Sequence, residues 1–145
     1  MQNKKRFSFL TSEIDAAYHQ AAQLLGLSDS AMRILYTICL YGDSCLLSDI
    51  ISLSAIQKQT INSALRKLEN AGMVRLEPAG GKRKRVCLTT GGKVLAQNSA
   101  LRVLQMENEI FASWPDKDVD AYVALTEKYL SAFRAQLQTL GGTER

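Results

Sequence analysis

Residues 48–88 read SDIISLSAIQKQTINSALRKLENAGMVRLEPAGGKRKRVCL, and this stretch decides the fold. Its pattern predicts a short helical segment, a turn at 54–56 and a longer helix over 57–70. A strand over 73–77, a Gly-Gly turn and a second strand over 85–88 follow. A helix-turn-helix followed by a basic β-hairpin is typical of proteins that hold duplex DNA.

The longer helix has a clear end and one apolar face. Gly72 stands where a helix needs a residue that adopts the left-handed conformation, so we expect the helix to stop at Ala71. Residues 78–81, Pro-Ala-Gly-Gly, are typical of a hairpin turn between the two strands. The residues at helical spacing that we expect to face inward are Ile61, Ala64, Leu65 and Leu68.

Amphipathic helices are predicted on both sides of this stretch. Ser12 is the expected cap of the first helix, Ser28 or Asp29 that of the second, and Thr90 that of the helix after the hairpin. Trp114-Pro115 ends that helix, because proline restricts the residue before it. The predicted helices cover 11–25, 28–41, 46–52, 57–70, 90–113 and 116–140.

The predicted fold is mainly α with a small β-hairpin, arranged as a winged helix-turn-helix with N- and C-terminal dimerisation helices. We expect a single domain over 1–145, with the winged helix-turn-helix at about 30–90 and dimerisation helices at 1–27 and 91–140. Long amphipathic helices at both ends are best buried against a second copy, so a homodimer is favoured over a monomeric helical cap.

Positive charge is concentrated in the same stretch. Residues 58–85 contain eight basic and two acidic residues, a net charge of +6, whereas the whole chain carries +4. The remainder is therefore slightly acidic. A local positive field on a nearly balanced molecule indicates a polyanionic partner.

Composition argues against several other functions. The chain lacks an apolar run long enough to cross a bilayer and a secretory signal, so a cytoplasmic protein without membrane contact is expected. Its odd number of cysteines, three, and its single histidine fit neither a disulfide framework nor a metal site. With no phosphate-binding glycine loop or nucleophile motif either, we expect no enzyme, metal or cofactor.

The helix over 57–70 is the predicted reading element, because the N-terminal part of a recognition helix meets base edges in the major groove. Gln59 and Asn62 suit the edge of adenine, whereas Lys58 can contact guanine or phosphate. Thr60 and Arg66 are expected at phosphates. The full set of candidates is Gln57, Lys58, Gln59, Thr60, Asn62, Ser63 and Arg66.

The hairpin tip is the second predicted contact. Lys82, Arg83, Lys84 and Arg85 follow the Gly-Gly turn, and strand alternation predicts the two arginines on one face and the two lysines on the other. An arginine at this place can enter a narrow minor groove. Such contacts supply affinity and salt dependence more than base specificity.

These residues resemble the MarR family of bacterial winged-helix transcription regulators. The match runs through SDIISLSAIQKQTINSALRKLENAGMVRLE and continues through KRKRVCLTTGGKVLAQ, with its Leu-Thr-x-x-Gly helix start at 88–92. The resemblance implies a homodimer on a pseudo-palindromic operator, repressing nearby genes until a small, often aromatic ligand releases it. Many members hold the wing arginine with a preceding Asp, whereas this chain has Gly80-Gly81-Lys82 there.

The sensing mechanism is left open by the sequence. Tyr18, Tyr36, Tyr41 and Trp114 are candidates for a pocket that binds an aromatic ligand, although aromatic residues in amphipathic helices are more often core. Cys45 is the candidate for redox sensing, which requires an exposed thiolate of low pKa. Cys39 and Cys87 are interpreted as structural.

Two alternatives to a ligand-released repressor remain at this level. One is a winged-helix interaction module that binds protein or RNA. The other is a cysteine-based redox-sensing regulator.

Overall fold

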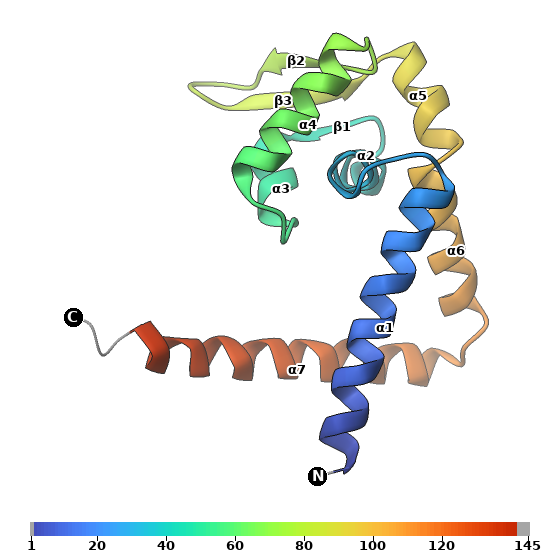
Figure 1. Ribbon diagram of the computed structural model, residues 1–145, viewed down its shortest axis with the longest axis vertical. Coiled ribbons are helices and arrows are strands. Elements are labelled where there is room, and N and C mark those ends of the chain that lie inside the picture. The colour runs from blue at the N-terminus through green and yellow to red at the C-terminus, as the bar shows by residue number, and fades with distance from the viewer. Residues whose placement is uncertain (1, 142–145) are drawn as a thin grey trace. The chain divides into compact units, whose positions relative to one another are not determined.

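The computed structural model describes residues 2–141, which form helices and one small sheet (Figure 1). The predicted fold class, a mainly helical winged helix-turn-helix, is confirmed. The helices are α1 (Gln2–Leu24), α2 (Asp29–Tyr41), α3 (Leu47–Ser52), α4 (Lys58–Asn70), α5 (Thr90–Gln97), α6 (Ala100–Ala112) and α7 (Asp116–Gly141). The strands are β1 (Ser44–Leu46), β2 (Val74–Pro78) and β3 (Lys84–Leu88).

The sheet contains a strand that the sequence did not predict. Among the described residues it has three antiparallel strands in the order β1-β3-β2, so β3 lies in the centre. Val86 of β3 is opposite Leu76 of β2 on one side and Cys45 of β1 on the other. The short strand β1 therefore closes the otherwise open edge of the hairpin and fixes β3 on both sides.

The apolar stripe predicted for α4 is buried as expected. Ile61, Leu65 and Leu68 face the core, and Ala64 is half-buried beside them. They meet the apolar face of α2, which Figure 1 shows end-on below α4. Fully burying a side chain of this size contributes about 1.5–3 kcal/mol. Other large hydrophobic side chains that are fully buried in this core are those of Ile34, Leu35, Ile38, Ile50 and Val86.

Helix ends follow the expected chemistry at two places and depart from it at one. Ser28 caps α2, since its Oγ accepts a hydrogen bond from the amide of Ala31 at 3.1 Å. Gly72 has φ of +75° after α4, as predicted. The expected cap Thr90 is wrong: Thr89 caps α5, accepting from the amide of Gly92 at 3.0 Å.

Two predicted helices have different bounds in the structure. The first was expected to begin near Thr11 but begins at Gln2, so Ser12 lies inside α1. The helix expected over 90–113 is divided into α5 and α6 at Asn98-Ser99. Ser99 is buried, and its hydroxyl donates to the carbonyl of Leu95 at 2.6 Å. This bond satisfies the buried hydroxyl at the break between the two helices.

The described residues fall into two compact units, divided between Met106 and Glu107. The first unit contains the winged core and α1. The second contains α7, which has no buried residue within the described chain. No helix of residues 2–141 is long and apolar enough to cross a membrane.

Candidate nucleic-acid interface

The start of α4 is held in place by the turn before it. The hydroxyl of Ser54 accepts a hydrogen bond from the amide of Ile56 at 3.0 Å, which closes a compact turn. Ile56 is half-buried against the core. The backbone therefore enters α4 from a fixed position, and the direction of the first helical turn is set by packing rather than by a free loop.

The first turn of α4 is exposed and polar. Gln57 is the N-cap residue, and Lys58, Gln59 and Thr60 follow with exposed side chains. Within the described residues, the Gln57 side chain makes no capping hydrogen bond. Amide groups of a first helical turn lack partners within the helix and attract anions. This end of α4 therefore offers N–H groups, hydroxyl and amide side chains and one cation to a phosphate or a base edge.

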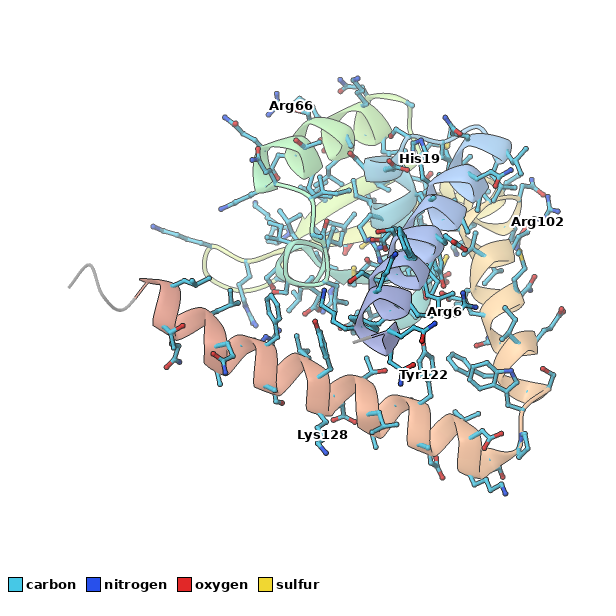
Figure 2. The ribbon with its side chains drawn as sticks, turned by 60° about the horizontal axis from the view of Figure 1, so that its bottom comes forward. Arg6, His19, Arg66, Arg102, Tyr122 and Lys128 are labelled. Carbon is cyan, nitrogen blue, oxygen red and sulfur yellow. The ribbon has the colours of Figure 1, made fainter. Side chains whose placement is uncertain are left out.

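The second turn continues the same polar face. Ser63 and Arg66 are exposed, and Asn62 is half-buried. Figure 2 shows Arg66 pointing away from the body of the helix. Partial burial of Asn62 limits the directions that its amide can take, which is favourable for a residue expected to read one base edge. Gln59, Ser63 and Arg66 thus lie on the side of α4 opposite its buried stripe, and Asn62 lies at the edge of that side.

The hairpin forms a narrow basic projection beside α4 (Figure 1). Gly80 and Gly81 have φ of +96° and +59°, which accounts for two glycines at the tip. The amide of Ala79 donates to the carbonyl of Arg83 at 2.9 Å, and the amide of Arg83 donates to the carbonyl of Gly80 at 3.1 Å. Lys82, Arg83 and Lys84 are all exposed. The turn is closed by its own backbone, leaving these side chains available.

Arg85 differs from its three basic neighbours. It is half-buried in the central strand, and its guanidinium donates to the hydroxyl of Ser44 in β1 at 3.4 Å. The predicted pairing of Arg83 and Arg85 on one face does not hold as a strand pattern, because β3 begins only at Lys84. Residues 82–84 are therefore the fully exposed basic residues of the hairpin. Ser44, the partner of Arg85, carried no signal in the sequence.

Arg83 lies close over the glycine turn. A Cβ atom added to Gly80 would lie 3.3 Å from the Nη2 atom of Arg83. At the base of the hairpin, the Arg75 guanidinium forms an ion pair with the Glu77 carboxylate at 3.2 Å. Glu77 also accepts a hydrogen bond from the thiol of Cys87 at 3.5 Å. The one acidic residue of the hairpin is thus engaged at its base, and the basic tip keeps its positive field.

The predicted aromatic candidates come from different elements of the chain. Tyr18 of α1 and Tyr41 of α2 are exposed, and Tyr36 is half-buried with the Arg33 guanidinium 5.7 Å from its ring centroid. Tyr36 and Tyr41 are five residues apart in α2 and therefore project in different directions. In the second unit, Trp114 packs against Tyr122 at a centroid distance of 5.6 Å and against Phe111 at 5.3 Å.

Cys45 has the opposite of the properties required for a redox sensor. Its side chain is 1% exposed, in strand β1. Burial, with the nearby carboxylate of Asp49, raises the pKa of the thiol from 9.0 to about 11. Cys87 is also buried, and burial raises its pKa as well. Register places Cys45 opposite Val86, so Cys45 and Cys87 point to opposite faces of the sheet and are not placed as a sensor and its resolving partner.

Metal binding has no site in the described part of the chain, where no cluster of three or more histidine, cysteine or acidic side chains is arranged to hold an ion. Burial raises the pKa of the thiols of Cys39, Cys45 and Cys87, which makes these groups less reactive. The chemistry offered by the exposed side chains is hydrogen bonding and positive charge, concentrated on α4 and on the hairpin tip.

Comparison with known proteins agrees with this geometry. Residues 25–85 match the MarR family, whereas none of the curated proteins gives a significant match. The fold resembles a MarR family regulator from Neisseria meningitidis, with 20% identity and a TM-score of 0.70 over 91% of this chain and 99% of that chain.

Two further structures resemble the chain. The MepR–DNA complex of S. aureus gives 20% identity and a TM-score of 0.62 over 89% of this chain and 96% of that one. NadR in complex with 4-hydroxyphenylacetate gives 16% identity and a TM-score of 0.66 over 85% of this chain and 89% of that one. At these identities the structures show a shared fold. The family match covers residues 25–85, the winged-helix segment, and the likeness of fold to these structures extends over most of the chain.

Replacing Asn62 tests the reading helix. Asn62→Ala removes a side chain that can donate and accept at one base edge, so we expect a loss of about 1–3 kcal/mol of discrimination at one position of the bound site. The measurement is a set of affinities for duplexes that differ at single base pairs. Asn70→Ala, at the exposed far end of α4, is the matched control and should change nothing. Unchanged discrimination in Asn62→Ala would show that α4 reads DNA elsewhere or not at all.

Replacing Arg83 tests the hairpin tip. Arg83→Ala should weaken binding to all duplexes by a similar factor, because a phosphate or groove contact carries little base information. The slope of log affinity against log salt should fall by about one. Lys128→Ala is the control, since it removes a charge from the exposed surface of α7 (Figure 2). An equal effect of both substitutions would mean that only net charge matters.

Alkylation tests the assignment of Cys45 as structural. A rise in pKa from 9.0 to about 11 lowers the thiolate fraction at pH 8 by about a hundredfold. Burial slows the reaction further. Mass spectrometry should therefore find Cys45 unmodified in the native protein long after it is labelled in the urea-unfolded chain. Equal rates in the two states would restore Cys45 as a sensor candidate.

Proposed function

We propose that this protein is a sequence-specific regulator of transcription that binds duplex DNA as a homodimer and represses nearby genes. One observation carries the proposal: the polar face of α4 and the basic tip at residues 82–84 are both exposed on one packed core. An α-helix of this kind fits the major groove, and a basic hairpin beside it reaches the adjoining backbone. The likeness to the MepR–DNA complex supports this reading.

A second copy of the chain is the proposed partner for the terminal helices. In α1, the side chains of Phe7, Leu10, Ile14 and Tyr18 are more than two-fifths exposed. Monomers seldom leave apolar surface of this extent in water. A two-fold dimer would cover it and would also present two recognition helices, as a pseudo-palindromic site requires. The exposed apolar side chains of α7 are Tyr122, Val123, Leu125, Tyr129, Leu130, Phe133, Leu137 and Leu140.

Release by a small aromatic ligand is the proposed form of control. NadR was crystallised with 4-hydroxyphenylacetate, which supports a phenolic or aromatic acid as the class of ligand. Tyr18, Tyr36 and Tyr41 stay candidate contacts, and Arg33 beside Tyr36 adds a cation that suits an anionic ligand. A ligand that binds the DNA-free form better than the DNA-bound form lowers occupancy of the operator.

Selection from random duplex DNA tests the proposed function directly. Purified protein is mixed with random duplexes, the bound fraction is sequenced, and affinities for enriched and scrambled sequences are measured across a salt series. We expect an inverted repeat with half-sites about one helical turn apart. Enrichment of no sequence, with an affinity that only declines as salt rises, would contradict sequence reading and favour an interaction module for RNA or protein.

A charge on α7 should disrupt the dimer. Phe133→Glu places a carboxylate on an exposed apolar stripe, where Phe133 stacks on Tyr129 at a centroid distance of 6.0 Å. Burial of an unpaired charge in an interface costs several kcal/mol. The variant dimer should therefore dissociate at protein concentrations at least about a hundredfold higher than those at which the wild-type dimer dissociates. Sedimentation equilibrium measures this.

Gln138→Glu is the matched control for this variant, because it adds the same charge on another face of α7. It should leave the dimer intact. A wild-type protein that sediments as a monomer at all concentrations would refute the proposed assembly.

A further inference from the structure

The end of α4 and the start of α5 are joined through one side chain, that of Thr89. Its hydroxyl donates to the carbonyl oxygen of Gly72 and accepts from the amide of Gly92 at 3.0 Å. A hydroxyl has one donor and two acceptor sites, so it can make both bonds together. The amide of Thr89 also donates to the carbonyl of Met73 at 3.1 Å. The carbonyl of Thr89 accepts from the amide of Lys93 at 2.9 Å, so four hydrogen bonds meet at this residue.

The residues that Thr89 binds are themselves fixed to the last turn of α4. Gly72 donates its amide to the carbonyl of Glu69 at 3.0 Å, and Met73 donates to that of Leu68 at 2.9 Å. With φ of +75° at Gly72, this is the usual closed end of a helix. A bond to the Gly72 carbonyl is therefore a bond to α4 as a rigid body.

The first turn of α5 also lies close to the backbone of Met73. A Cβ atom added to Gly92 would lie 1.8 Å from the carbonyl oxygen of Met73, which no side chain can accommodate without movement. A Cβ atom added to Gly91 would meet its nearest atom, the sulfur of Met73, at 3.7 Å, an ordinary contact. The close approach is therefore specific to Gly92.

The helix held at this joint is the segment through which the chain leaves the winged core. Ala96 of α5 and Ala100 of α6 are buried in that core, and Val103 is buried one turn further on. The C-terminal end of α4 is thus joined directly to this segment at Thr89 and Gly92. A small rotation at the joint would swing the exposed end of α4, some 13 residues away, by a larger distance.

We propose that Thr89 is a positioning residue, which fixes the direction of α4 relative to α5 and thereby sets the spacing at which the two recognition helices of the dimer are presented. This inference rests on the proposed function. It makes Thr89 a determinant of operator spacing without any contact to DNA. The expected consequence is selective: loss of the hydroxyl should relax the preference for spacing and leave the preference for bases within a half-site unchanged.

The experiment compares Thr89→Val, Thr89→Ala and Thr89→Ser with wild type. Valine keeps the shape and removes the hydroxyl, alanine removes the hydroxyl with less crowding, and serine restores it. Affinities are measured for the selected inverted repeat and for versions whose half-sites are one base pair closer or farther apart. A duplex with a single half-site is the internal control, and circular dichroism establishes that each variant is folded.

For wild type and Thr89→Ser, we expect a sharp optimum at one spacing. The spacing penalty is the ratio of the affinity at the optimal spacing to the affinity at a spacing changed by one base pair. For Thr89→Val and Thr89→Ala, this ratio should fall by about threefold or more, which is within the range by which residues between two sites change their coupling. Single-half-site affinity should stay unchanged in all. Equal weakening on every duplex, an unchanged penalty, or unfolding of both hydroxyl-free variants would overturn the positioning role. A wild type without any optimum would overturn the proposed dimeric reading, and this inference with it.

A glycine pair gives an independent check. Gly91→Ala and Gly92→Ala add the same methyl group at neighbouring positions, and only the second meets the carbonyl of Met73. Gly91→Ala should keep the wild-type spacing optimum. Gly92→Ala should broaden it as Thr89→Val does, because α5 must move away from the end of α4. A broadened optimum in Gly91→Ala of the same size would argue against a specific joint.

Discussion

The apolar stripe of α4 is the contact on which the rest of the molecule depends. Ile61, Leu65 and Leu68 lock one side of the helix into the core, and this leaves the polar side no alternative but to face outward. Each burial is worth about 1.5–3 kcal/mol, more than a hydrogen bond between exposed groups contributes. The core contacts and the exposed polar side chains thus occupy different faces of one helix, so a change on the polar face need not disturb the fold.

The basic hairpin divides its residues between holding the sheet and meeting a partner. Arg85 donates a hydrogen bond to Ser44 within the sheet, and Arg75 forms an ion pair with Glu77 on strand β2. The charge that remains free is at 82–84, on a turn held by its own backbone hydrogen bonds. Affinity that depends on salt would come from this tip, and base preference from α4.

The sequence was sufficient for the reading motif and insufficient for its surroundings. Helix period, Gly72 and the turn at 78–81 are local signals, so α4 and the hairpin could be predicted. Strand β1 is three residues long and exists through pairing with β3, forty residues later, which no local pattern reveals. The division at Ser99 has neither glycine nor proline to mark it. The half-burial of Arg85 depends on β1, and was missed with it.

The central claim, that α4 reads the major groove while the hairpin tip meets the flanking backbone, is tested most directly by footprinting on a selected inverted repeat. Methylation protection reports the major groove, and hydroxyl-radical cleavage reports the backbone. We predict two protected major-groove segments about one helical turn apart on one face of the duplex, each flanked by backbone protection that disappears in Arg83→Ala. Weak, uniform protection along the duplex would contradict the account. Loss of the two major-groove protections in Arg83→Ala would contradict it as well.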